Sequence, residues 1–141
     1  RIKDAISKLV GKPAPAPVVR LVELIFAEAM TLQASHVILR PDGDALEVVY
    51  VIDGKEVPRD RVPSNLTAAL VTRLKVLCNL DVTAAKSMER GRIDMNVGAV
   101  PKSCEVVFQE LSEGVSILLD FVSTPFAEAP EVVQAWWLTE V

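Results

Sequence analysis

A strongly apolar strand pattern followed by a tight turn places the strongest constraint on how this chain folds. Residues 45–52 read ALEVVYVI, and Asp53-Gly54 comes directly after them. An Asp-Gly pair favours a type I′ turn, because both central residues of that turn need positive φ angles. Residues 55–58 then return as a short strand, so the centre of the chain predicts a β-hairpin. The side chains that share one face of the first strand are Leu46, Val48, Tyr50 and Ile52.

Amphipathic patterns on both sides of this hairpin predict an α+β fold. Residues 17–35 and 62–82 carry apolar side chains at helical spacing, with polar residues on the opposite side. Further strand patterns occupy residues 36–40, 92–97, 103–111 and 115–121, and residues 83–91 read as a polar loop. A last helix begins at Pro130. This order predicts a mixed or antiparallel sheet backed by two amphipathic helices, plus a C-terminal helix.

A proline-rich stretch divides the chain into segments. Residues 11–17 read GKPAPAP, and alternating prolines favour an extended backbone. We therefore expect an N-terminal helix over residues 1–10, a linker over 11–17, a folded domain over 18–122 and a C-terminal segment with a helix over 123–141. The chain begins with Arg instead of Met, so we expect it to be a fragment of a longer protein.

The overall composition argues against several classes of function. A net charge of −4 argues against a nucleic-acid-binding protein, because a phosphate-binding face brings an excess of Lys and Arg. The sequence has no apolar run of about 18 residues, so we expect no membrane insertion. Cys78 and Cys104 are predicted to be small buried hydrophobes in a reducing compartment, which indicates a cytoplasmic protein.

The side chains that catalysis needs are scarce. His36 is the single histidine, and no Cys or carboxylate cluster at ligand spacing accompanies it, so no metal site is predicted. The sequence contains neither a GxxxxGK phosphate loop followed by Ser or Thr nor a GxSxG nucleophile turn. We therefore predict no catalytic residue and no cofactor, and we do not expect the chain alone to be an enzyme.

One stretch is basic in an otherwise acidic chain. The residues KSMERGR include Lys86, Arg90 and Arg92 beside a single acid, Glu89. Such a loop can bind an anion such as a phosphate, and it can equally be a solvated loop. Lys86, Arg90 and Arg92 are the candidate phosphate contacts.

Two groups of large apolar residues predict a surface for a protein partner. Trp136 and Trp137 are adjacent in the last helix, so they cannot both face one side of it. One is expected to pack on the domain and the other to contact another chain. Phe26 and Met30 flank the wide apolar stripe of the first helix, which we expect to be covered by its own sheet or by a neighbour. These four residues form the predicted partner interface.

Five stretches of the sequence carry a family resemblance. In chain order they read PVVRLVELIFAEAMTLQASHVILRP, LEVVYVIDGKEV, LTAALVTRLKVLCNLDV, GRIDMNVG and EGVSILLDF, and they cover residues 17–121. In this order and spacing they resemble the N-terminal domain of type II secretion and type IV pilus assembly ATPases. The resemblance implies a PAS-like domain that packs against a RecA-like ATPase domain. It also implies hexamers in which arginines of this domain reach nucleotide phosphates.

The chain departs from the family pattern where that pattern is polar. The family strand S-D-I-H-I-E-P has its polar positions at His36, Ile38 and Arg40 of this chain. The arginine of the family strand V-D-x-R-V falls at Val107, and the arginine before P-Q-D-G-R falls at Lys86. Valine cannot bind a phosphate oxygen, and lysine offers a point charge instead of a planar fork. The resemblance therefore implies a scaffold that has lost most nucleotide contacts.

Three functions remain open from the sequence. The first is a non-catalytic docking domain that binds a secretion or pilus ATPase domain, another component of that machinery or a second copy of itself. The second is a regulatory domain in which Lys86, Arg90 and Arg92 complete a neighbouring ATPase subunit's site. The third is a PAS-like sensor with a small ligand between sheet and helix. A longer protein that contains this chain could still be an ATPase.

Overall fold

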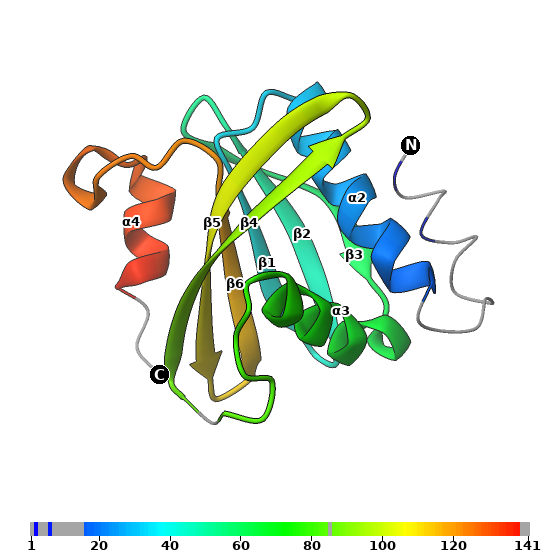
Figure 1. The fold of residues 1–141 in the computed structure, drawn as a ribbon. Coiled ribbons are helices and arrows are strands. Elements are labelled where there is room, and N and C mark those ends of the chain that lie inside the picture. Colours follow the sequence, from blue (N-terminus) through cyan, green and yellow to red (C-terminus); the bar gives the residue numbers. More distant parts are fainter. Residues whose placement is uncertain (1, 3–5, 7–15, 85, 139–141) are drawn as a thin grey trace.

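One curved antiparallel sheet forms the centre of the computed structural model, which describes residues 2, 6, 16–84 and 86–138 (Figure 1). The sheet has six strands in the order β3-β2-β1-β6-β5-β4. The strands are β1 (His36–Asp42), β2 (Ala45–Ile52), β3 (Lys55–Val62), β4 (Met88–Val97), β5 (Val100–Leu111) and β6 (Gly114–Asp120). The helices are α2 (Ala16–Thr31), α3 (Ser64–Leu77) and α4 (Glu131–Trp137), with a 3₁₀-helix η1 (Phe126–Glu128). The predicted α+β class is confirmed.

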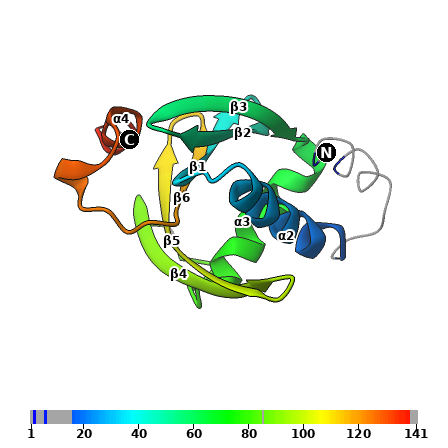
Figure 2. The same ribbon diagram turned by 90° about the horizontal axis from the view of Figure 1, so that it is seen from above.

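The pairing of β1 with β6 joins two halves of the chain into one sheet. β1, β2 and β3 form one antiparallel meander, and β4, β5 and β6 form another. His36 pairs with Asp120, and the register continues to Leu39 opposite Ile117. Figure 2 shows that the joined sheet curves around α2 and α3, while α4 lies on its other side. The two sides are called the inner and the outer face below.

The central hairpin forms as the sequence predicts. Asp53 has a φ angle of 51° and Gly54 one of 79°, as a type I′ turn requires. β3 runs further than predicted, to Val62, because the register shifts between Val48 and Val49 and pairing then resumes. β3 is an edge strand, which tolerates a proline within its length.

The inner face carries the larger part of the core. α2 and α3 pack their apolar stripes on it, and Leu21, Leu70 and Tyr50 have no exposed surface. Phe26 belongs to this core and meets Phe121 edge-to-face, with ring centres 5.2 Å apart. Ile2 and Ile6 are also buried here. Complete burial of such side chains contributes roughly 1.5–3 kcal/mol each, so this face supplies most of the driving force for folding.

The outer face is apolar as well, and α4 covers it. Val133 and Trp136 of α4 pack on the sheet in a second core, called the outer-face cluster. The sheet residues of this cluster are Ile38, Val49, Val51, Val107 and Leu118. β2 is therefore buried on both faces, and this explains why both alternating sets of residues 45–52 are apolar.

β4 begins earlier than the sequence pattern indicates. The predicted polar loop ends before Met88, and the pairs Met88–Gln109 and Arg90–Val107 place both β4 residues in the ladder with β5. The prediction that Arg90 lies in a loop is therefore wrong, because pairing with β5 outweighs the weak strand propensity of MERGR. A buried ion pair between Lys75 and Glu89, 3.2 Å apart, ties α3 to this strand.

The structure also shows the end of α3, the two cysteines and the start of α2. Asn79 follows α3 with a φ angle of 57°, a left-handed conformation that is common where helices end. Cys78 and Cys104 are buried and free, as predicted. α2 begins at Ala16, inside the predicted linker, whereas residues 7–15 lie outside the described part of the chain. The described helices include none with the length and apolar character needed to cross a membrane.

Gly91→Ala is expected to destabilise the fold. A Cβ at this position would clash with Cβ of Cys78, so the end of α3 would have to move away from β4. Overpacking of this kind costs about 1–3 kcal/mol in the free energy of unfolding, measurable by urea titration. Asn96→Ala, at an exposed position of the same strand, is the control and should change stability little. Unchanged stability of Gly91→Ala would contradict the close approach of α3 to β4.

Candidate functional site

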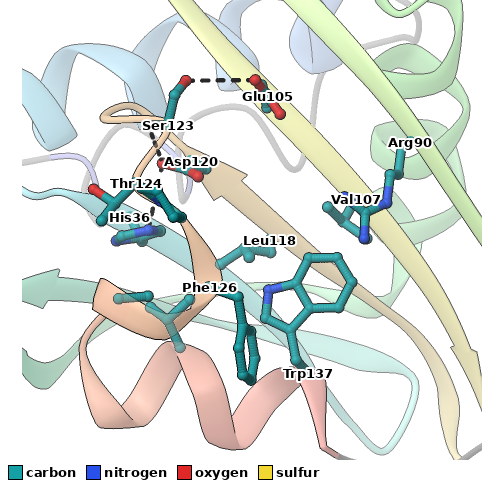
Figure 3. A pocket seen from close by; sticks show the side chains of 13 residues that line it. His36, Arg90, Glu105, Val107, Leu118, Asp120, Ser123, Thr124, Phe126 and Trp137 are labelled. Atoms are coloured by element: carbon teal, nitrogen blue, oxygen red, sulfur yellow. Dashed lines mark hydrogen bonds and ion pairs between the residues drawn. The ribbon is translucent and has the colours of Figure 1, made fainter.

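A groove between the outer face and the C-terminal segment is the candidate site (Figure 3). Its volume is about 410 Å³. The sheet strands supply one wall, and η1, α4 and the residues before them supply the other. The lining residues with charged, titratable or aromatic side chains are His36, Arg90, Glu105, Asp120, Phe126 and Trp137. The groove therefore combines polar groups on the sheet with aromatic rings on the C-terminal segment.

His36 lies at the bottom of the groove, with its side chain 1% exposed. Its Nε2 is 3.4 Å from Oδ1 of Asp120, and its Nδ1 is 2.8 Å from Oγ of Ser35. Because the Asp120 carboxylate can only accept a hydrogen bond, we assign the imidazole proton to Nε2. Nδ1 then accepts a hydrogen bond from the Ser35 hydroxyl. Burial lowers the pKa of His36, although the Asp120 carboxylate opposes that shift. The imidazole is therefore neutral at neutral pH.

Asp120 also holds the start of the C-terminal segment. Its Oδ1 accepts hydrogen bonds from the backbone N–H of Val122, at 3.0 Å, and of Ser123, at 2.8 Å. Ser123 has a φ angle of 53°, a left-handed conformation that is unfavourable for a residue other than glycine. Its hydroxyl lies 3.5 Å from Oε1 of Glu105. One carboxylate thus connects the buried histidine to the turn by which the chain leaves the sheet.

Arg90 and Trp137 meet across the groove. The guanidinium carbon of Arg90 lies 4.2 Å from the centre of the Trp137 ring, a cation–π distance. Trp137 packs edge-to-face on Trp136 and on Phe126, with ring centres 5.4 Å and 6.4 Å away. The structure therefore brings together a residue predicted to contact phosphate and one predicted to contact a partner.

Arg92 and Lys86 lie apart from the groove. Nε of Arg92 is 3.2 Å from Oδ1 of Asp94 on the same strand. Lys86 is exposed in the connection before β4. Within the described residues, the cavities do not gather Lys86, Arg90 and Arg92 around one space. Their contact with a phosphate stays a prediction.

The other predicted partner residues have different surroundings. Phe26 is fully buried in the inner core, so it offers no surface to a partner in this structure. Trp136 is 6% exposed and packs on the sheet, as predicted for one of the two tryptophans. Met30 is half-buried and lines a separate cavity beside Phe121. Of the predicted partner residues, Trp137 is the one that lines the groove.

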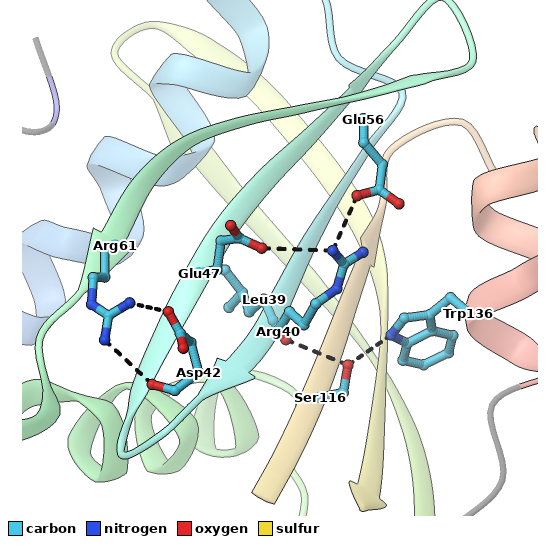
Figure 4. A network of polar contacts seen from close by, with 8 residues as sticks. All are labelled: Leu39, Arg40, Asp42, Glu47, Glu56, Arg61, Ser116 and Trp136. Atoms are coloured by element: carbon cyan, nitrogen blue, oxygen red, sulfur yellow. Dashed lines mark hydrogen bonds and ion pairs between the residues drawn. The ribbon is translucent and has the colours of Figure 1, made fainter. Parts of the chain in front are cut away.

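Two of the positions where the chain departs from the polar family pattern lie on the outer face, and a third, Arg40, is on β1. Ile38 and Val107 lie in the outer-face cluster beneath α4. Arg40 is paired with two acids, because its Nη1 lies 3.0 Å from Glu56 and 3.6 Å from Glu47 (Figure 4). These side chains are therefore occupied within the chain itself.

Sequence reasoning missed the groove residues Asp120, Glu105 and Phe126. Asp120 directly follows the apolar run of β6, but its role depends on pairing opposite His36. Phe126 is an isolated aromatic residue in an irregular stretch, and its position depends on how that stretch returns to α4. The sequence contains no local signal for either contact.

The groove has the features of a binding surface. The carboxylate of Asp120 contacts two backbone N–H groups and the His36 ring. The guanidinium of Arg90 contacts an aromatic ring. Among the described residues, no three or more His, Cys, Asp or Glu side chains are placed to hold a metal ion together. The arrangement thus offers hydrogen-bonding groups and aromatic surface to a ligand or partner.

The comparisons of this chain with known proteins all point to one family. Residues 12–111 match the family described as type II/IV secretion system protein. The chain is 32% identical over 135 residues to the type II secretion system protein E of Xanthomonas campestris, a match that covers 89% of this chain and 24% of that protein. It is 35% identical over 95 residues to the type IV pilus assembly ATPase PilB of Myxococcus xanthus, covering 67% of this chain and 17% of that protein. The chain thus spans about a quarter or less of the length of these relatives.

The single histidine predicts a specific dependence of stability on pH. The pKa of His36 is lowered in the folded state, so the unfolded chain takes up a proton more readily. The stabilising contribution of neutral His36 is therefore complete above the ordinary value of 6.5, and it is lost as the pH falls below that value.

The free energy of unfolding can be measured by urea titration at pH 7.5 and pH 5.5. The loss of stability on acidification should be smaller in His36→Gln than in the unchanged protein, which separates the imidazole from the carboxylates. An NMR titration should find the pKa of the His36 imidazole below 6.5. An equal loss in both proteins, or a raised pKa, would contradict the neutral buried imidazole.

Proposed function

From the premise that the chain belongs to the family of type II/IV secretion system proteins, we propose that it is a non-catalytic docking domain of a secretion or pilus assembly machine. The observation that carries this proposal is the state of the outer face. Ile38 and Val107, at positions where the family pattern is polar, are apolar and covered by α4. The scaffold is retained, while the side chains that would reach a nucleotide are replaced.

The docking surface in this proposal is called the aromatic patch, and it consists of the rings of Phe126 and Trp137 with the neighbouring aliphatic side chain of Leu138. Phe126 is 46% exposed and Leu138 is 71% exposed. Trp137 is half-buried and holds the guanidinium of Arg90 on its ring. Exposed aromatic residues beside an arginine are the side chains that most often dominate protein–protein binding energy. The patch also borders the groove, which gives a partner both apolar and polar contacts.

Charge favours a partner with basic side chains. Glu105 and Asp120 line the groove, and Glu128 and Glu131 lie in the elements beside the aromatic patch. The chain as a whole carries a net charge of −4. Complementary charge accelerates encounter and rejects wrong partners more than it adds affinity. A domain of the secretion or pilus machinery with a basic face fits these features, and a cytoplasmic location follows from that assignment.

The proposal assigns no catalysis to this chain. The family match covers residues 12–111, and the matched relatives are several times longer. In a longer protein that contains this domain, ATP hydrolysis would belong to a region outside it. Contact of Lys86, Arg90 and Arg92 with a nucleotide of a neighbouring subunit is the alternative. It is less favoured, because Arg90 is held by Trp137 and Arg92 by Asp94.

Trp137→Ala is expected to weaken docking. Binding to the purified ATPase domain of the same machinery would be measured by size-exclusion chromatography and by titration calorimetry. Loss of a central aromatic residue should lower affinity about tenfold or more. Val76→Ala, which truncates an apolar residue 49% exposed on α3, is the control and should leave affinity unchanged. Equal affinity of both variants would remove the aromatic patch from the interface.

Titration with a non-hydrolysable ATP analogue separates the two functions. The docking proposal expects no binding by the unchanged chain up to roughly 1 mM, and no effect of Lys86→Ala or Arg92→Ala. The comparison is made with the chain alone and with the ATPase domain present. Micromolar binding that either substitution weakens would establish the nucleotide-contacting alternative instead.

A further inference from the structure

We propose that α4 is an exchangeable element, which covers the outer face of its own chain or that of a second copy. Two copies would then associate by trading their C-terminal helices. This inference goes beyond the docking function and does not depend on it. It rests on four observations: the outer face needs a cover, α4 fits it, the C-terminal segment is self-contained, and its connection is strained.

The outer face needs a cover whichever chain supplies it. Its five sheet residues are Ile38, Val49, Val51, Val107 and Leu118, and each is no more than 5% exposed while α4 is in place. They come from four neighbouring strands, so removal of α4 would open one continuous apolar surface across the centre of the sheet. Monomeric proteins rarely leave such a surface in water. A chain whose α4 has detached is therefore a receptor for a second helix of the same kind.

α4 fits this face through a small set of contacts that any copy can make. Val133 and Trp136 stand three residues apart, on one side of the helix, and insert into the outer-face cluster. Nε1 of Trp136 donates to Oγ of Ser116 at 2.8 Å, and that hydroxyl lies 3.5 Å from the carbonyl oxygen of Leu39 (Figure 4). The two polar groups that receive Trp136 belong to β6 and β1. The bond is the same whether α4 belongs to the same chain or to another.

The C-terminal segment from residue 126 to residue 138 holds itself together. Nε2 of Gln134 donates to the carbonyl oxygens of Phe126, at 2.9 Å, and of Ala129, at 3.2 Å. The rings of Phe126 and Trp137 also meet within this segment. α4 has only 7 residues, too few for a stable isolated helix, so these internal contacts help it to move as one unit.

The connection between β6 and this unit is short and strained. It runs from Phe121 to Pro125, and Ser123 within it has a φ angle of 53°. That backbone conformation is held by the carboxylate of Asp120 and is unfavourable for serine. A strained short connection favours exchange, because an open, extended connection relieves the strain while all packing contacts are remade in the partner.

The test uses the full chain, studied by light scattering after size-exclusion chromatography from 10 µM to about 1 mM, the effective concentration of a short linker. We expect a dimer whose fraction rises over this range. Ser123→Gly removes the strain of the closed form, so it should lower the association constant about fivefold or more. Ser112→Gly, in the turn between β5 and β6, is the matched control and should have no effect.

Mixed isotope labelling then distinguishes exchange from ordinary association. In a dimer made from labelled and unlabelled copies, NMR contacts between the Trp136 ring of one copy and the Ile38 or Leu118 methyl groups of the other are expected. This measurement needs no substitution, so it does not depend on a variant that fails to fold. A monomer at every concentration would overturn the proposal, and so would a dimer whose Trp136 contacts all lie within one chain. Either result would leave docking through the aromatic patch intact.

Discussion

The structure depends on a sheet that is apolar on both faces. Val48 and Tyr50 of β2 face the inner core, whereas Val49 and Val51 of the same strand face α4. Water must be kept from both sides, because exposed apolar area costs roughly 25 cal/mol per Å². Two long helices cover the inner face, and a single short helix covers the outer one. The unequal covers divide the molecule into a stable core and a more lightly held surface.

The groove is a consequence of that incomplete cover. α4 covers the centre of the outer face, and the groove at its margin is lined by the buried His36 and the partly exposed Asp120. His36 and Asp120 lie opposite each other where β1 pairs with β6. These two residues therefore line the groove and also belong to the strand pairing that joins the two meanders into one sheet. The same carboxylate holds the backbone at Ser123, where the chain turns away. Fold, groove and the path of the C-terminal segment are thus connected through one residue.

The outer face also connects the proposed docking role with the proposed exchange of α4. The family resemblance of the sequence implies polar residues at positions 38 and 107, whereas Ile38 and Val107 of this chain are apolar and lie beneath α4. This helix of the same chain covers them and brings Trp137 to the surface beside Arg90. An aromatic patch and a detachable helix are both suited to assembly, since each offers apolar area to another protein chain.

The sequence by itself determined the elements, the α+β class, the Asp53-Gly54 turn and the family, because alternation, helical spacing and turn chemistry are local properties. Only the tertiary structure decided that Arg90 lies in β4, that Phe26 is buried, and which tryptophan packs on the sheet. The groove was not predictable for the same reason. Its contacts join residues far apart in the sequence, and they exist only once β1 has paired with β6 and the C-terminal segment has folded back across them.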